Sequence, residues 1–206
     1  MNIWFVRHGE TDANVAGLYS GISETALTPR GEQQARALST LLAQVPFDRV
    51  ITSELGRATA TARLVLAGRD LTTQTNSQLN EMHFGAWEMC HHKTLIAQGS
   101  AQYLAWCNDW QNTVPPGGEG FQAFSQRING LADWLKTENQ RDAAQQILLV
   151  SHKGVLGLLL AHLLGMPADG MWRFDIGQGC WSRVELLGDY AILRTLNSQS
   201  CAWPVG

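Results

Sequence analysis

Short apolar runs alternate with amphipathic segments along most of this 206-residue chain, and this alternation limits the possible folds more than any other feature. Apolar runs that end in polar or turn-forming residues are typical of buried strands, whereas apolar residues spaced three and four apart predict helices. Strands alternating with helices favour a parallel sheet covered on both faces. The sequence therefore predicts an α/β fold, a three-layer α/β/α sandwich with a mostly parallel central sheet and an inserted helical lid.

Four short strands and a terminal hairpin are expected, with helices between them. Thr28 followed by Pro29 predicts a helix start, because threonine caps helices and proline is tolerated in the first turn. The expected strands are residues 2–6, 49–51, 71–75 and 147–150, the expected helices are 29–45, 54–67, 119–137 and the segment opened by 151–154, and the hairpin strands are 180–187 and 190–196.

Residues 80–118 break this pattern with a concentration of aromatic and amide side chains, closed by Pro115-Pro116-Gly117-Gly118. We expect a helical lid over about residues 82–118, inserted into a single domain that spans residues 1–206. Its aromatic side chains favour packing within the lid, and stacking against a ligand is the less favoured alternative.

Composition excludes some classes of partner. A formal net charge of −3 gives no reason to expect binding to nucleic acid or to bulk membrane. No apolar segment approaches the roughly 18 residues of a membrane span, and residues 1–6 lack the basic leader of a signal peptide. Four scattered cysteines (Cys90, Cys107, Cys180 and Cys201) predict reduced, mostly buried thiols in a cytoplasmic protein.

Two of the expected strands end at a histidine, in the sequences Arg7-His8-Gly9 and Ser151-His152-Lys153-Gly154. Ligands of open α/β sheets bind beyond the carboxyl ends of strands, so we expect the two imidazoles to face each other across one crevice, both within reach of solvent. Arg7 adds a planar cation suited to phosphate, and the second loop opens a helix whose amino end favours anions. The pattern predicts a site for a phosphate ester.

Other polar residues are ordinary when taken alone. Arg57 is expected on the first turn of its helix and Glu81 in a loop, and each is usually a solvated side chain. His91 and His92 do not predict a metal site, because neighbours on a helix point apart and no carboxylate accompanies them.

Four motifs nevertheless follow one another in a fixed order. They are Arg-His-Gly-Glu-Thr at 7–11, Ser-Glu-x-x-Arg-Ala-x-x-Thr-Ala at 53–62, Asn-Glu-Met-x-Phe-Gly-x-Trp-Glu at 80–88 and Ser-His-x-Gly at 151–154. Together they resemble the histidine phosphatase superfamily over essentially the whole chain. The resemblance implies a small-molecule phosphomonoester as substrate and a reaction without metal or other cofactor.

The resemblance also implies a role for individual residues. His8 is the expected nucleophile, and Glu81 the expected proton donor and then base, its pKa raised by apolar neighbours. The expected phosphate-binding residues are Arg7, Asn14, Gly21, Arg57, His152 and Lys153, together with the backbone after His152. Lys153 stands where many relatives carry glycine, and two readings stay open for it: a charge at the rim of the site, or a side chain in solvent.

Longer stretches resemble bacterial phosphatases of cobalamin biosynthesis, which remove the 5′-phosphate of α-ribazole 5′-phosphate or of adenosylcobalamin 5′-phosphate. These stretches are residues 17–21, 79–82, 87–92, 106–110, 118–127 and 178–182. The alternatives are a broad-specificity sugar-phosphate phosphatase, a phosphoglycerate mutase and, outside the enzymes, an inactive phosphoanion-binding module. Against the mutase, Lys93 is the only lysine or arginine between Glu81 and Arg127, so a second phosphate has few partners.

Overall fold

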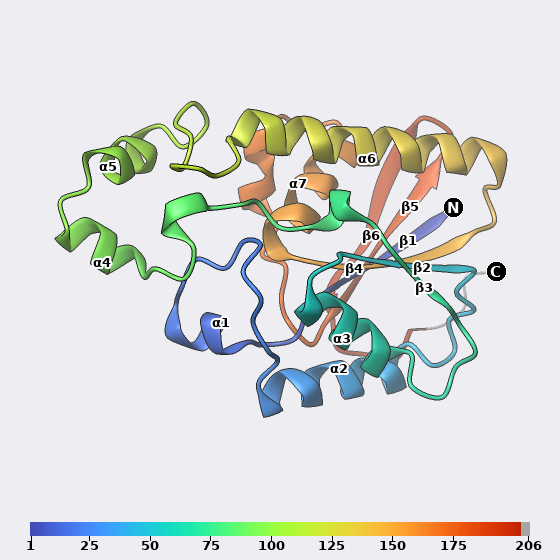
Figure 1. Cartoon of the computed structure of the whole chain (residues 1–206). Coiled ribbons are helices and arrows are strands. Elements are labelled where there is room, and N and C mark those ends of the chain that lie inside the picture. The colour runs from blue at the N-terminus through green and yellow to red at the C-terminus, as the bar shows by residue number, and fades with distance from the viewer. Residues whose placement is uncertain (203–206) are drawn as a thin grey trace.

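A computed structural model describes residues 1–202 as one six-stranded sheet between two layers of helices, as the sequence predicts (Figure 1). The strands are β1 (Asn2–Arg7), β2 (Arg49–Thr52), β3 (Thr73–Thr75), β4 (Gln146–Ser151), β5 (Trp181–Leu187) and β6 (Tyr190–Ser198). They lie in the order β3-β2-β4-β1-β5-β6, in which β1 to β4 are parallel and the β5–β6 hairpin is antiparallel.

Helices cover the sheet in two pairs, because successive side chains of a strand point to opposite faces. In β1, Ile3 and Phe5 pack with α6 (Phe121–Arg141) and α7 (Lys153–Leu163), whereas Trp4 and Val6 pack with α2 (Pro29–Leu41) and α3 (Gly56–Val65). The expected helices are therefore confirmed to within a few residues at each end. The side chain of Thr28 caps α2 as predicted, accepting a hydrogen bond from the amide of Gly31.

Three short elements were not expected. Helix α1 (Asp12–Ala16) begins at Thr11, whose side chain and that of Asn14 form a reciprocal capping box. The other two are 3₁₀ helices, η1 (Ser77–Leu79), before the third motif, and η3 (Ala168–Arg173), which packs on α7. We return to η3 because it carries a side chain of the site.

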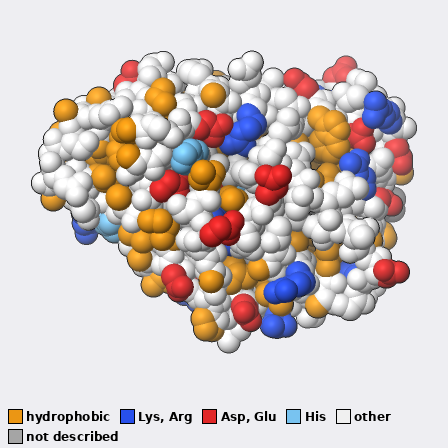
Figure 2. Space-filling model, viewed as in Figure 1, with side chains coloured by type: hydrophobic (Ala, Val, Ile, Leu, Met, Phe, Trp, Pro, Cys, Tyr) orange, Lys and Arg blue, Asp and Glu red, His pale blue; other side chains and the backbone are white. Residues whose placement is uncertain are grey.

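The predicted lid consists of η2 (Gly85–Trp87) and two small helices, α4 (His92–Ala97) and α5 (Ala101–Asn108), which lie to one side of the sandwich in Figure 1. It has a core of its own, formed by Trp87, Leu95 and Tyr103. Hydrophobic side chains gather on the surface of this part of the molecule (Figure 2). Ile96 on α4 and Leu104 on α5 are both exposed.

One sequence expectation needs correction. The four cysteines are unpaired as predicted, but they are not mostly buried: Cys90 and Cys180 are partly exposed, and Cys107 and Cys201 are exposed. Both exposed cysteines lie outside the sandwich helices and strands, Cys107 on a small lid helix and Cys201 after the last strand. Within residues 1–202, no helix is long and apolar enough to cross a bilayer.

Candidate active site

The two strand-end histidines converge, as the sequence predicts. Strands β1 and β4 are neighbours in parallel register, with Arg7 opposite Ser151, and the amide of His8 donates to the carbonyl of Ser151 at 2.9 Å. The residues that follow the two strands must therefore lie side by side. The ring centroids of His8 and His152 are 5.1 Å apart.

The surroundings of His8 determine which ring nitrogen carries the proton. Its Nδ1 lies 2.8 Å from the carbonyl oxygen of Gly9, which only accepts hydrogen bonds, so Nδ1 is the protonated nitrogen and Nε2 keeps its lone pair. Burial, aided by the cation of Arg57, lowers the pKa of His8 to about 3 although the Gly9 carbonyl raises it. At neutral pH the ring is therefore uncharged and presents a nucleophilic nitrogen.

The expectation that both imidazoles are open to solvent is wrong for His152. His8 is 5% exposed, whereas His152 has no exposed surface. The reason is topological, because β4 lies between β2 and β1 in the middle of the sheet, and His152 follows it directly into α7. His152 is therefore shielded from solvent at the closed end of the site.

Two arginines lie in the same electrostatic cluster, Arg7 partly buried and Arg57 buried. Arg7 donates through Nη1 to the carbonyl of Ile176 at 3.0 Å, and Arg57 donates through both terminal nitrogens to carbonyls of residues 20, 21 and 23. The Nε atoms of both are buried, and within residues 1–202 they have no hydrogen-bond partner. Burial lowers both pKa values while Glu81 raises them, and an arginine keeps its charge under such conditions. The cluster is thus cationic and has donors to spare.

Glu81 lies at the edge of this cluster. Its carboxylate accepts hydrogen bonds from its neighbour Met82 and from the amide of Gly154, both at 3.0 Å. Burial raises the pKa of Glu81, although the two amides and the two arginines lower it in part. The direction agrees with the sequence expectation, and it favours a carboxyl group that holds a proton at higher pH than usual.

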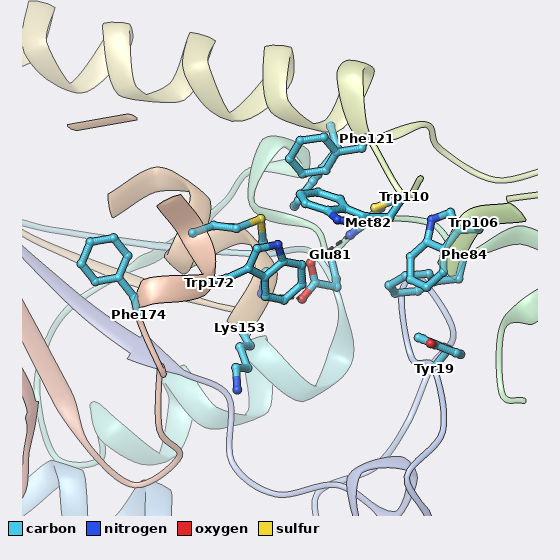
Figure 3. Close-up of a pocket in the computed structure, with 13 residues that line it drawn as sticks. Tyr19, Glu81, Met82, Phe84, Trp106, Trp110, Phe121, Lys153, Trp172 and Phe174 are labelled. Atoms are coloured by element: carbon cyan, nitrogen blue, oxygen red, sulfur yellow. Dashed lines mark hydrogen bonds between the residues drawn. The ribbon is translucent and has the colours of Figure 1, made fainter. Parts of the chain in front are cut away.

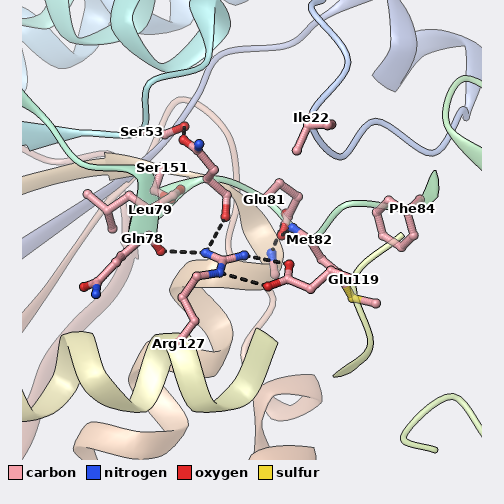
Figure 4. A network of polar contacts seen from close by, with 12 residues as sticks. Ile22, Ser53, Gln78, Leu79, Glu81, Met82, Phe84, Glu119, Arg127 and Ser151 are labelled. Atoms are coloured by element: carbon pink, nitrogen blue, oxygen red, sulfur yellow. Dashed lines mark hydrogen bonds and ion pairs between the residues drawn. The ribbon is translucent and has the colours of Figure 1, made fainter. Parts of the chain in front are cut away.

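Arg127, on α6, fixes the loop that carries Glu81 (Figure 4). Its Nη1 donates to the carbonyls of Gln78 at 2.7 Å and Asn80 at 2.9 Å, while Nε and Nη2 pair with Glu119 at 3.0 and 2.8 Å. Because one guanidinium group holds the carbonyls of residues 78 and 80, the backbone directly before Glu81 has little freedom to move. Arg127 was not among the predicted site residues.

Asn14 and Gly21, both predicted to bind phosphate, have different partners in the structure. The Oδ1 of Asn14 accepts from the amide of Thr11 at 3.1 Å and from the side chain of Gln178 at 2.8 Å, which orients the amide group. The amide of Gly21 donates to Glu88 at 3.1 Å rather than toward the histidines, and its carbonyl accepts from Arg57.

Lys153 forms an ion pair of 2.6 Å with Asp175 at the surface. It also lines the cavity described below, so of the two readings left open the structure favours a charge at the rim. The phosphate-binding role of Asn14, Gly21 and Lys153 stays a prediction.

Glu88 is a residue that the sequence motifs contained without indicating a role. Its carboxylate accepts hydrogen bonds from the amides of Gly21, Ile22, Ser23 and Phe84, and from the hydroxyl of Ser23. Burial alone would raise the pKa of Glu88, but these donors outweigh it and the pKa is lowered. The charged carboxylate therefore anchors the loop whose carbonyls hold Arg57.

An aromatic cavity of about 210 Å³ opens beside Glu81 (Figure 3). Trp110 packs edge-on against Phe121 at 4.4 Å and against Trp172 at 5.5 Å between ring centroids. In the view of Figure 3, Glu81 lies between Trp172 on one side and a second group of rings on the other. Apart from Glu81, Lys153 and Gly154 the wall is apolar: Tyr19, Met82, Phe84, Trp106, Trp110, Phe121, Phe124, Met171, Trp172 and Phe174.

The aromatic residues of the lid region therefore divide into two groups. Trp87 and Tyr103 pack edge-on at 5.2 Å in the lid core, as the favoured sequence reading predicts. Trp110 lines the cavity instead, and Trp106 belongs to both groups, since it lines the cavity and also packs on Trp87 and Tyr103. Trp172, from η3, completes the wall although it lies in none of the four motifs.

The part of the chain that the structure describes contains no group of three or more histidine, cysteine or acidic side chains placed to hold a metal ion. The two lid histidines differ from expectation in one respect. His91 is the N-cap of α4 rather than a helical residue, and its ring lies 5.3 Å from that of His92 instead of pointing away.

Comparison with known proteins places the chain among phosphatases. The family model of the histidine phosphatase superfamily (branch 1) matches residues 3–199. An adenosylcobalamin/alpha-ribazole phosphatase of Salmonella typhimurium is 52% identical over 97% of this chain and 98% of its own. The crystal structure of the alpha-ribazole phosphatase from Shigella flexneri is 53% identical, covers 98% of each chain and superposes with a TM-score of 0.93. A probable phosphoglycerate mutase of Escherichia coli O139:H28 is more distant, 32% identical over 90% of this chain and 85% of its own.

Proposed function

The chain belongs to the histidine phosphatase superfamily, and we propose that it is a phosphomonoesterase that removes the 5′-phosphate of α-ribazole 5′-phosphate or adenosylcobalamin 5′-phosphate through a phosphohistidine at His8. One observation carries the chemistry: the neutral His8 ring, with Nε2 unprotonated, lies 5.1 Å from His152 in a cluster with Arg7 and Arg57. A second carries the substrate class: the aromatic cavity that begins at Glu81.

In the first step the lone pair of His8 Nε2 forms a bond to phosphorus while the bond from phosphorus to the ester oxygen breaks. Glu81 gives its proton to that oxygen, so the leaving group departs as an alcohol. The raised pKa of Glu81 supports this role, because the carboxyl group must hold a proton before the step begins.

In the second step water attacks the phosphohistidine. The water oxygen forms a bond to phosphorus while Glu81, now a carboxylate, takes a proton from the water. The electron pair of the nitrogen–phosphorus bond returns to His8. The products are inorganic phosphate and the starting form of the protein. The same carboxyl group serves as acid and then as base, as it does in other two-step transfers.

Charge on the phosphoryl oxygens is matched by Arg7, Arg57 and His152. Phosphoryl transfer depends largely on positioning and charge stabilisation, and fixed cations act strongly where water is excluded. The buried, unpartnered Nε atoms of both arginines are donors of the kind that an anion would satisfy.

The cavity favours a flat aromatic leaving group. The ester oxygen must lie near Glu81, so the group attached to it extends into the space lined by Trp110, Trp172 and Phe84. Such walls suit the benzimidazole of α-ribazole and offer little to a small charged acid such as phosphoglycerate. Lys153 is the only basic residue among the cavity's lining.

A turnover panel tests this proposal. We expect kcat/KM for α-ribazole 5′-phosphate to exceed that for 3-phosphoglycerate and for glucose 6-phosphate by at least about 100-fold. Quenching in alkaline detergent should trap phosphate on the protein that is stable to base and labile to acid. Equal rates across the panel would contradict the substrate assignment, and the absence of a trapped phosphoprotein would contradict the phosphohistidine. The cytoplasm is the proposed location.

A further inference from the structure

Ser53 lies between His152 and Asn80 at the closed end of the site. Its Oγ is 2.8 Å from His152 Nε2 and 2.8 Å from Asn80 Oδ1, and it also accepts from the amide of Leu55 at 3.2 Å. The other ring nitrogen of His152, Nδ1, is buried and has no hydrogen-bond partner in residues 1–202. This chain of contacts determines where the proton of His152 lies.

The orientation of the Asn80 amide is fixed from outside the chain of contacts. The backbone amide of Glu54 donates to Asn80 Oδ1 at 2.9 Å, and Asn80 Nδ2 donates to the carboxylate of Glu54 at 3.1 Å. A backbone N–H only donates and a carboxylate only accepts, so the two ends of the amide cannot be exchanged. Oδ1 is therefore an acceptor for Ser53.

The capacity of the Ser53 hydroxyl is then fully used. A hydroxyl has one proton to donate and two lone pairs. The proton goes to Asn80, and the lone pairs accept from Leu55 and from His152 Nε2. Nε2 must therefore carry the hydrogen, and in the neutral ring Nδ1 is left as a buried lone pair. An unpartnered buried polar atom destabilises a fold, which calls for an explanation.

His8 also offers a lone pair to a bound phosphoryl group. Its Nδ1–H donates to the carbonyl of Gly9, so its Nε2 is unprotonated. Two lone pairs repel phosphoryl oxygens, so one ring has to become a donor, and His8 has to stay unprotonated to attack. We propose that His152 takes up one proton on Nδ1 when a phosphoryl group binds, and that Ser53 and Asn80 are positioning residues that reserve this atom for it. The inference rests on the function proposed above and specifies the protonation of that site.

The charges around His152 agree with a switch driven by the anion. Burial lowers its pKa most, followed by His8, Arg57, Arg7 and Arg127, so the ring is neutral before the anion binds. The acidic groups nearby already have partners: Glu81 accepts from Gly154, and Glu54 from Asn80. A bound dianion reverses the sign of the local field and favours the imidazolium.

Nitrogen NMR of the full-length protein tests the proposal with sulfate, a tetrahedral dianion that itself takes up no proton near neutral pH. At pH 7.5 we expect His152 to show protonated Nε2 and unprotonated Nδ1 without sulfate, and both nitrogens protonated when sulfate is saturating. Calorimetry in buffers of different ionisation enthalpy should give about one proton taken up per sulfate. An Nδ1 that stays unprotonated in the complex, or that carries the proton without sulfate, would overturn the proposal.

Variants test whether Ser53 and Asn80 determine which nitrogen of His152 carries the hydrogen. Asn80→Leu frees the Ser53 hydroxyl to donate to Nε2, so Nδ1 carries the hydrogen in the neutral ring and proton uptake falls from about one to near zero. Ser53→Ala removes the same constraint by a different change and should give the same result. Ser125→Ala is the matched control, because it removes a serine–histidine contact of 3.2 Å with His162 outside the site and should leave uptake at one.

Two further outcomes count against the proposal. Uptake that persists in Asn80→Leu shows that the contacts do not set the tautomer, and uptake that disappears in Glu81→Gln shows that the proton goes to Glu81. The function proposed above is judged separately, by turnover and trapped phosphoprotein, so the two ideas can fail independently.

Discussion

The phosphate end of the site and the aromatic cavity meet at Glu81, but they come from different parts of the fold. His8, His152 and Arg57 follow or lie close behind strands β1, β4 and β2, and the sheet fixes their separation. The cavity walls come from the lid region, the start of α6 and η3. One end is buried and cationic, while the other is apolar. From this difference we expect phosphoryl transfer to depend on side chains that the sheet holds in place, and the choice of leaving group to depend on the walls of the cavity.

The two ends also influence each other electrostatically. Apolar walls exclude water around Glu81, which raises its pKa, whereas Arg7 and Arg57 act in the opposite direction. The balance leaves the carboxyl group able to donate a proton beside a cluster that attracts anions. The cationic end alone would bind phosphate but would not protonate the leaving alcohol. The cavity alone would bind the alcohol part of the substrate but would not transfer its phosphate.

The largest effect is expected from His8→Ala, which removes the nucleophile from the phosphate end and leaves the cavity unchanged. Turnover should fall by at least about 10⁴-fold, on the scale seen when nucleophiles of covalent enzymes are removed, and trapped phosphoprotein should disappear. His92→Ala, at an exposed lid histidine, is the control and should keep both. Acid-labile phosphate that remains in His8→Ala would place the covalent step on another residue.

Glu81→Gln tests the point where the phosphate end and the aromatic cavity meet, because it removes the proposed proton donor and leaves the cations and the aromatic side chains in place. For an alkyl phosphate, kcat should fall by about 10²–10⁴-fold, the usual contribution of general acid catalysis. For p-nitrophenyl phosphate, whose leaving group needs little protonation, phosphoenzyme formation should fall much less. With the alkyl ester, the wild type should lose activity as pH rises through the raised pKa of Glu81, and the variant should lack this limb.

Equal losses with the two esters would refute the role of Glu81 as acid. Glu32→Gln is a suitable control, since this glutamate lies exposed on α2 and pairs only with Arg36. It should leave both rates and the pH profile unchanged.

The centre of the sheet was predictable because β1, β2 and β4 carry the simplest signal in the sequence, a short apolar run ended by a polar residue. The approach of His8 to His152 follows from that signal together with the rule on strand ends. Helix α1 was missed because five residues show no periodicity, although its capping pair, Thr11 and Asn14, was visible. The full burial of His152 was missed because strand order is not written in any local pattern.

Most of the site residues that the sequence analysis missed were missed because the direction of a side chain cannot be read from a sequence pattern. Ser53 and Asn80 stood in the motifs, but only coordinates reveal that they meet at His152. Arg127 lies on a helix whose apolar stripe was recognised, and its contacts with carbonyls depend on the loop beside it. Trp172 lies in a segment without periodicity or motif, so its place in the cavity had no sequence signal.

The free energy of unfolding should depend on pH through the phosphate end of the site, which contains the buried histidines. The pKa of His8 is about 3 in the folded protein and about 6.5 when unfolded, so the unfolded chain binds more protons below pH 6.5 and stability falls as pH drops through this window. Between pH 8 and pH 5 this amounts to about 2 kcal/mol for His8, and the neutral His152 contributes with the same sign. Urea unfolding of His8→Gln should therefore show a correspondingly smaller loss.

Trp172→Ala should keep the pH slope of the wild type, because the indole that it removes has no group that titrates in this range. An equal slope in wild type and His8→Gln would contradict the neutral, buried imidazole.

The smallest effect is expected in the cavity itself. Trp172 is 65% exposed yet stands edge-on to Trp110, which is an unusual position for a large apolar side chain that contributes little to the core. If it stacks on the base of the substrate, Trp172→Ala should lower kcat/KM for α-ribazole 5′-phosphate by about tenfold, within the range for aromatic–base stacking. Glycerol phosphate, which has no ring, should react at the wild-type rate. Tyr190→Ala, at an aromatic residue that is 62% exposed on the β5–β6 hairpin, should change neither rate. A loss shared by both substrates in Trp172→Ala would mean that the two ends of the site are coupled through the fold, because a wall that only selects the leaving group has no effect on an ester that does not touch it.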